Sequence, residues 1–220
     1  MIKACIFDLD GTVINTSESL RYSVSETMKS FGYQELSKEQ TLKYVGNGGK
    51  NLIRRALAFN GNTNEDDLEK AHALYKKIFR ENCTRDNEAY EGMPDVLKCL
   101  KEKGMKMAVI SNKSQNGSEA CVSKVYGDGL FDKVYGERPG IPLKPDPSGI
   151  IALIDELRIK PEECLYIGDG DTDMQGGNAA GCITVGVTWG YRSREVLEEN
   201  NADHIIDKPK ELLYLLTEMQ

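Results

Sequence analysis

Four short segments of the sequence collect side chains that could carry out chemistry. They combine carboxylates, a lysine and small hydrogen-bonding groups within a few positions of one another. In chain order they are Asp8-Leu9-Asp10-Gly11-Thr12, Ser111-Asn112-Lys113, Leu143-Lys144-Pro145-Asp146-Pro147 and Gly168-Asp169-Gly170-Asp171-Thr172-Asp173. Brought together, these groups could bind a metal ion and a phosphate.

The carboxylates indicate a divalent cation and phosphoryl transfer. Asp8 and Asp10 lie two residues apart, so they face the same side of an extended segment. Asp169, Asp171 and Asp173 fall within five positions, and like-charge repulsion makes such a cluster costly without a cation. A turn followed by a helix accounts for one of the three, Asp171. Oxygen ligands suit Mg²⁺, which bridges to substrate phosphate, and one of Asp8 and Asp10 could attack phosphorus while the other moves protons.

Lys144 and the neighbouring pair Ser111 and Asn112 supply groups that a phosphate needs. Two prolines restrict the backbone around Lys144. The ammonium, the hydroxyl and the amide could neutralise and bind phosphoryl oxygens. Lys113 follows the pair, and we expect its side chain to point away. Each segment alone also fits an ordinary turn or helix cap. Only the four segments taken together predict a reaction centre.

Short apolar runs alternate with helical patterns along the chain, which is typical of an α/β protein with a parallel sheet. Strands are expected at 3–7, 105–110, 131–135, 164–167, 182–187 and 204–206. Ligands of such sheets bind outside the carboxyl ends of the strands. The chemistry-bearing segments are therefore expected to meet at one edge of the sheet.

The first two strands are separated by about a hundred residues that contain helical patterns and no clear strand. The patterns cover 17–31, 37–44, 50–60, 64–82 and 94–103. Ser37 with Gln40 is typical of a capping box, and Asn64 of an N-cap. One helix suffices for a crossover between parallel strands. The extra helices predict an inserted all-α subdomain at 16–88, within a core made of 1–15 and 89–220.

Composition excludes several classes of function. The chain has 220 residues and a net charge of −7, which argues against a nucleic-acid-binding surface. No apolar run is long enough for a membrane span, and the N-terminus does not have the pattern of a signal peptide. The six cysteines lack metal-site or redox-motif spacing. We therefore expect a cytoplasmic protein with reduced thiols that binds neither nucleic acid nor membranes.

In their order along the chain, the four segments resemble the motifs of the haloacid dehalogenase superfamily, and the helical insert resembles its C1-type cap. The resemblance implies a Rossmann-like parallel sheet flanked by helices, with an inserted all-α cap. It also implies that Asp8 is the nucleophile and forms an aspartyl-phosphate. Asp10 would be the general acid and then the base that activates water.

The same resemblance implies a Mg²⁺ site and a phosphate site. The metal would be held by the Asp8 carboxylate, the Asp10 backbone carbonyl and Asp169. Asp173 would bind a metal-bound water or orient the metal ligands. The residues implied to hold the phosphoryl oxygens are Ser111, Asn112 and Lys144, and Lys144 would also offset the repulsion between phosphate and Asp8.

A glycine-rich segment of the insert looks like the cap loop of phosphoglycolate phosphatases. Its candidate substrate-facing residues are Gly46, Asn47 and Gly48. A plain turn between helices, capped by Asn47, is the alternative. The chain departs from the common pattern of the superfamily at Asn15, where many relatives have Asp, and at Gly170, where Ser or Thr is usual.

These features predict a Mg²⁺-dependent phosphomonoester hydrolase of phosphoglycolate phosphatase type, acting on a small phosphorylated metabolite as a monomer or homodimer. A β-phosphoglucomutase-like phosphomutase is one alternative. A phospho-acceptor signalling module is another, of a different class. His72, His204 and Trp189 are expected to have structural roles.

Overall fold

The computed structural model describes residues 1–219, and the chain forms two compact units. The larger unit comprises Met1–Asn15 and Glu88–Gln220, and the smaller comprises Thr16–Asn87. That these units are separate core and cap domains stays a prediction.

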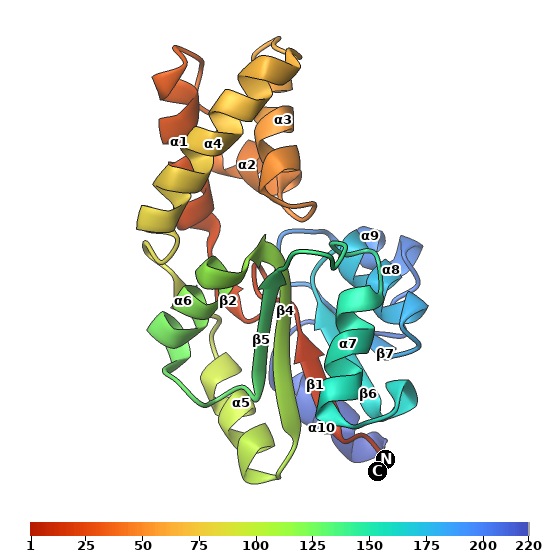
Figure 1. The fold of residues 1–220 in the computed structure, drawn as a ribbon. Coiled ribbons are helices and arrows are strands. Elements are labelled where there is room, and N and C mark those ends of the chain that lie inside the picture. The colour runs from red at the N-terminus through yellow and green to blue at the C-terminus, as the bar shows by residue number, and fades with distance from the viewer. Residues whose placement is uncertain (220) are drawn as a thin grey trace. The chain divides into compact units, whose positions relative to one another are not determined.

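The larger unit is built on a six-stranded parallel sheet (Figure 1). Its strands are β1 (Ala4–Phe7), β4 (Lys106–Ser114), β5 (Lys133–Glu137), β6 (Cys164–Gly168), β7 (Ile183–Val187) and β8 (His204–Ile206). Their spatial order is β5-β4-β1-β6-β7-β8, with every neighbouring pair parallel. The direction of winding reverses between β1 and β6. This topological switch point is where α/β sheets of this kind bind their ligands.

The central strands β1 and β6 are buried along their whole length, which explains why each is a continuous run of mostly apolar residues. Ala4 and Ile6 of β1 pack into a cluster with Ile150 and Leu153 of helix α7 (Ser148–Leu157). The alternate residues of the same strand, including Phe7, are buried as well. The α/β class and the Rossmann-like parallel sheet are therefore confirmed.

Further helices and a short ladder complete the larger unit. The helices are α5 (Met93–Glu102), α6 (Gln115–Tyr126), α8 (Asp171–Ala179), α9 (Arg194–Glu199), α10 (Glu211–Glu218) and the 3₁₀ turn η1 (Pro161–Glu163). The ladder pairs β2 (Ile14–Asn15) with β3 (Glu88–Ala89) in antiparallel fashion. It joins the points where the chain leaves and re-enters this unit, and two residues per strand are too few to give a sequence pattern.

The smaller unit is all-α. It contains α1 (Ser17–Ser30), α2 (Lys38–Tyr44), α3 (Gly49–Phe59) and α4 (Glu65–Asn82), and α4 packs against both α1 and α3. The capping box at Ser37 is confirmed, because the Ser37 Oγ accepts from the Gln40 N–H at 3.1 Å while the Gln40 Oε1 accepts from the Ser37 N–H at 2.9 Å. The N-cap at Asn64 is also confirmed, with Oδ1 accepting from the Asp67 N–H at 3.1 Å.

The largest difference from the expected elements lies in β4. This strand continues to Ser114 rather than ending at Ile110, so Ser111, Asn112 and Lys113 belong to the strand itself. β5 begins and ends two residues later than expected. The six cysteines are free. Among residues 1–219, none of the helices has the length and apolarity needed to cross a membrane.

Candidate active site

Three of the acidic residues meet at the switch point of the sheet. Asp8 directly follows β1, Asp169 directly follows β6, and Asp173 lies in the first turn of α8. One carboxylate oxygen from each lies within 4.8 Å of the other two, and all three residues are buried. The Asp8 N–H donates to the Ile167 carbonyl at 2.8 Å, which anchors Asp8 to the neighbouring strand.

The ammonium of Lys144 lies between two of these carboxylates. Its Nζ donates to Asp8 Oδ1 and to Asp173 Oδ1, each at 2.6 Å, and to the Ile110 carbonyl at 3.2 Å. Burial by itself would lower the pKa of Lys144, but Asp173 and Asp8 more than offset it and hold the pKa well above its usual value. A charged lysine is therefore fixed beside Asp8.

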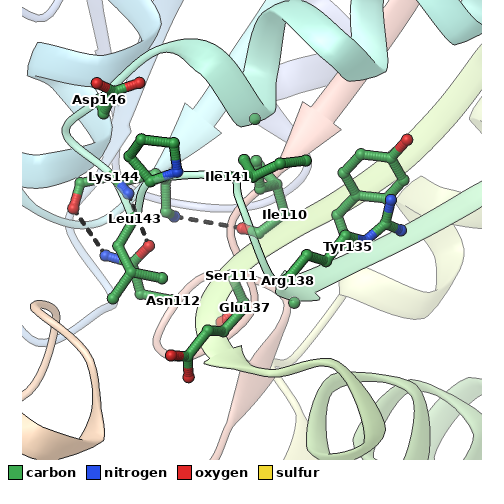
Figure 2. A pocket seen from close by; sticks show the side chains of 13 residues that line it. Ile110, Ser111, Asn112, Tyr135, Glu137, Arg138, Ile141, Leu143, Lys144 and Asp146 are labelled. Carbon is green, nitrogen blue, oxygen red and sulfur yellow. Dashed lines mark hydrogen bonds between the residues drawn. The ribbon is translucent and has the colours of Figure 1, made fainter.

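Asn112 holds the backbone of Lys144 in place. Figure 2 shows the reciprocal pair: Asn112 Nδ2 donates to the Lys144 carbonyl and the Lys144 N–H donates to Asn112 Oδ1, both at 2.8 Å. Beside Asn112, the Ser111 Oγ accepts from the Lys113 N–H at 3.2 Å. A small cavity of about 20 Å³, roughly enough for one water molecule, is lined by Ser111, Asn112 and Lys144 among others.

Backbone and hydroxyl groups fix the Asp169 carboxylate. Its Oδ2 accepts from the Tyr191 N–H at 2.6 Å, and its Oδ1 accepts from the Thr12 hydroxyl at 3.3 Å. Burial, and then the nearby Asp173, raise the pKa of Asp169 to about 7. The loop after β7 comes so close that a Cβ at Gly190 would lie 2.2 Å from the Asp169 Cβ, so only glycine fits there.

The Asp173 carboxylate has its own set of donors besides Lys144. Its Oδ2 accepts from the Gly170 N–H at 3.1 Å, and its Oδ1 accepts from the buried Tyr166 hydroxyl at 3.2 Å. Asp171 begins α8 and lies outside the cluster, with one oxygen 3.7 Å from Arg192 Nε. This position agrees with the interpretation of Asp171 as an acid at a helix N-terminus.

Lys113 is where the structure differs from the sequence analysis. We expected its side chain to point away, but the residue is only 8% exposed and its ammonium contacts Asp10 Oδ1. The Lys113 Nζ also lies 3.7 Å from Cys121 Sγ. The physical reason is that β4 continues through Ser114, past a shift in its pairing register between Ile110 and Ser114, and Lys113 belongs to this continuation. The polar residues of this segment gave no sign that the strand continues.

The charge balance of the cluster fits a divalent cation. Asp8, Asp10, Asp169 and Asp173 bring four carboxyl groups to this edge, whereas Lys113 and Lys144 bring two ammonium groups. Burial raises the pKa of Asp8 well above its usual value, and Asp173 and Asp169 add to the effect while Lys144 opposes it. Oxygen donors in this number are the ligands that Mg²⁺ takes in proteins.

Further residues support the site and were not singled out for it from the sequence. Tyr166 and Tyr191 hold two of the acids, as described above. The Trp189 Nε1–H donates to the Thr12 carbonyl at 3.0 Å, and its ring centroid lies 6.3 Å from that of Tyr90. Trp189 therefore packs within the larger unit, in line with its expected structural role.

The glycine-rich loop at Gly46, Asn47 and Gly48 belongs to the smaller unit. The N-cap of α3 is Gly48, with φ +82°, so Asn47 does not cap this helix as the alternative of a plain turn required. Instead Asn47 Oδ1 accepts from Arg55 Nη2 at 2.8 Å, because the positive φ of Gly48 places the helix start one residue later. Contact of this loop with a substrate stays a prediction.

Comparisons with known proteins identify the family of the chain. The family of haloacid dehalogenase-like hydrolases matches residues 5–187. A protein named phosphoglycolate phosphatase from Haemophilus influenzae is 30% identical over 96% of both chains, and one of the same name from Aquifex aeolicus is 29% identical over 98% of this chain and 97% of its own.

Solved structures show the same fold. A predicted phosphoglycolate phosphatase from Haemophilus somnus superposes with a TM-score of 0.91 at 25% identity over 98% of both chains. A β-phosphoglucomutase from Clostridium difficile gives a TM-score of 0.80 at 20% identity, covering 99% of this chain and 96% of its own.

The family match covers most of the chain, and the relatives cover nearly all of it, so the chain belongs to the haloacid dehalogenase-like hydrolase family. Within that family it is a phosphatase similar to phosphoglycolate phosphatases.

Proposed function

We propose that this phosphatase hydrolyses a small phosphomonoester in a Mg²⁺-dependent reaction that passes through a phosphorylated Asp8. The observation that carries the proposal is the buried Asp8 carboxylate, which Lys144 holds at 2.6 Å at the switch point of the sheet. A carboxylate fixed in this way is positioned to act as a nucleophile toward phosphorus.

The metal would be held by the carboxylates of Asp8 and Asp169 and by the backbone carbonyl of Asp10. Asp173, tied to Lys144 and to the Gly170 N–H, would orient these ligands. When bound, Mg²⁺ would supply positive charge that offsets the charge of the phosphate. The buried acids and the excess of negative charge among them support this assignment.

The chain's own residues account for both halves of the reaction. An Asp8 oxygen attacks phosphorus and the ester P–O bond breaks, while Asp10 gives a proton to the departing oxygen. Asp10 then takes a proton from the water that attacks the phosphorus and releases Asp8. Lys144, with Ser111 and Asn112, would bind the phosphoryl oxygens throughout.

The substrate we propose is a small phosphorylated metabolite of the 2-phosphoglycolate type. Support comes from the name that several relatives share. We propose that the smaller unit acts as a cap that selects this substrate through Gly46, Asn47 and Gly48. Backbone N–H groups of a glycine-rich loop can approach a small carboxylate closely.

The test is inorganic phosphate release from a panel of phosphomonoesters that includes 2-phosphoglycolate, with and without Mg²⁺. Release that requires Mg²⁺ and is greatest with 2-phosphoglycolate is expected. Release with another preference would contradict the substrate and leave the chemistry intact. Conversion of a sugar 1-phosphate to a sugar 6-phosphate without phosphate release would favour a phosphomutase. A stable phosphorylated Asp8 without turnover would favour a signalling module.

A further inference from the structure

Lys113 and Asp10 form a second, partly buried ion pair in addition to the one formed by Lys144 and Asp8. The side chains of Lys113 and Asp10 are 3% and 12% exposed, and the Lys113 Nζ contacts Asp10 Oδ1. The pair joins the end of β4 to the loop after β1, over 103 residues of sequence. Burying two charges is costly unless their geometry is well defined, so this contact fixes the Asp10 side chain in one place.

The two lysines contact different members of the acid cluster. Lys144 binds Asp8 and Asp173, whereas Lys113 binds Asp10. Lys144 therefore acts on the proposed nucleophile, and Lys113 acts on the residue proposed to transfer protons. The contact made by Lys113 uses Oδ1 of Asp10.

We propose that Lys113 is a positioning residue that orients Asp10 for proton transfer to the leaving group. This inference rests on the proposed function, in which Asp10 protonates the ester oxygen as the P–O bond breaks and the Asp8–phosphorus bond forms. Proton transfer requires the donor to lie within hydrogen-bond reach of the departing oxygen. Loss of the Lys113 contact removes a restraint that holds the Asp10 side chain in that position.

Leaving groups provide a readout that a structural role alone would not change. An alkyl alcohol departs as its alkoxide only at great cost, so its departure requires the proton from Asp10. A nitrophenolate is stable without a proton and departs without that help. Loss of Lys113 therefore slows phosphorylation of Asp8 by alkyl phosphates more than by p-nitrophenyl phosphate.

The experiment measures kcat/KM for 2-phosphoglycolate and for p-nitrophenyl phosphate in the wild type, Lys113→Met and Lys113→Gln, with Mg²⁺ present. We expect the loss for the alkyl substrate to exceed the loss for the aryl substrate by at least about tenfold, a part of the 10²–10⁴-fold that general acid catalysis contributes. Circular dichroism checks that each variant is folded. If the Met variant does not fold, the Gln variant, which keeps a polar end group, is judged by the same ratio.

Tyr126→Phe is the matched control. It removes another partly buried contact to the same loop, the hydrogen bond from the Tyr126 hydroxyl to the Val13 carbonyl at 2.5 Å. This variant should lower the thermal midpoint without changing the ratio of the two substrates. The double variant Asp10→Asn/Lys113→Met should show no larger ratio than Asp10→Asn alone, because the two residues act together.

Equal losses for both substrates in the folded Lys113 variant would overturn the inference, as would a ratio that Tyr126→Phe changes by the same amount. Additive effects of Asp10→Asn and Lys113→Met would also overturn it. A wild type that releases no phosphate from either ester would instead contradict the proposed function. The two failures are therefore distinguishable.

Discussion

Lys144 is the side chain on which the electrostatics of the nucleophile depend. Its ammonium touches Asp8 and Asp173 at 2.6 Å each and is almost completely shielded from water. Removal of one partner of a buried ion pair leaves an uncompensated charge, which is more costly than the loss of an exposed pair. Lys144 is therefore expected to matter for folding as well as for phosphate binding.

Lys144→Met should destabilise the metal-free protein by about 3–5 kcal/mol. The reason is that Asp8 and Asp173 would remain buried without their shared counter-charge. Urea unfolding followed by circular dichroism measures the effect. Lys133→Met is the control, since Lys133 pairs with Glu156 at the surface, and its unfolding midpoint should match that of the wild type. Equal urea unfolding midpoints for the wild type, Lys144→Met and Lys133→Met would contradict the inference that Lys144 neutralises the buried acids Asp8 and Asp173.

At the scale of elements, the loop after β7 controls the position of Asp169. The Tyr191 N–H donates to Asp169 Oδ2 at 2.6 Å, and a Cβ at Gly190 would come within 2.2 Å of the Asp169 Cβ. The segment before α8 is less crowded. A Cβ at Gly170, whose φ is −139°, would approach no heavy atom closer than 3.5 Å.

Gly190→Ala should therefore displace either the loop or the Asp169 carboxylate and weaken Mg²⁺ binding. Isothermal titration calorimetry with Mg²⁺ measures the loss. Gly170→Ser is the matched control, because its side chain has room, and its Mg²⁺ affinity should stay close to that of the wild type. Wild-type affinity in Gly190→Ala would show that this close approach does not govern the metal site.

The elements were predictable from the sequence because their signals are local. Continuous apolar runs predicted the strands of the buried sheet. The caps at Ser37 and Asn64 predicted where two helices begin, to within one residue. The β2–β3 ladder gives no such signal, since its two-residue strands are paired only by the tertiary fold.

The acid cluster was predictable for a different reason. Parallel strands bring their carboxyl ends to one edge, so Asp8 and Asp169 were expected at the same edge of the sheet, and the order of the strands makes them neighbours. Lys113 was missed because the strand was expected to end at Ile110, whereas it continues past a register shift to Ser114 and brings Lys113 to Asp10. The hydroxyl of Tyr166 was missed because its residue lies inside an apolar run that predicts only burial.

At the scale of the whole molecule, stability should depend jointly on Mg²⁺ and pH. Burial and Asp173 raise the pKa of Asp169 to about 7. A carboxyl group whose pKa is higher in the folded than in the unfolded chain binds its proton more tightly when folded. Its contribution to the stability of the metal-free protein is present at low pH and is lost as the pH rises from about 4 to about 7.

Metal binding requires the carboxylate form, so Mg²⁺ should raise the thermal midpoint more at pH 8 than at pH 6. Differential scanning fluorimetry with and without Mg²⁺ at the two pH values measures both shifts. Asp169→Asn serves as the control, and its Mg²⁺-induced shift should be small at both. A shift in the wild type that is larger at pH 6 would contradict the assignment of Asp169 as a metal ligand.

The central claim is that Asp8 receives the phosphoryl group, and phosphate release by Asp8→Asn in the presence of Mg²⁺ tests it most directly. The substitution keeps the size and shape of the side chain, so circular dichroism should show a folded protein. We predict a loss of at least about 10³-fold in kcat relative to the wild type, as expected when a nucleophile is removed. Phosphate release by folded Asp8→Asn at a rate near that of the wild type would contradict the account.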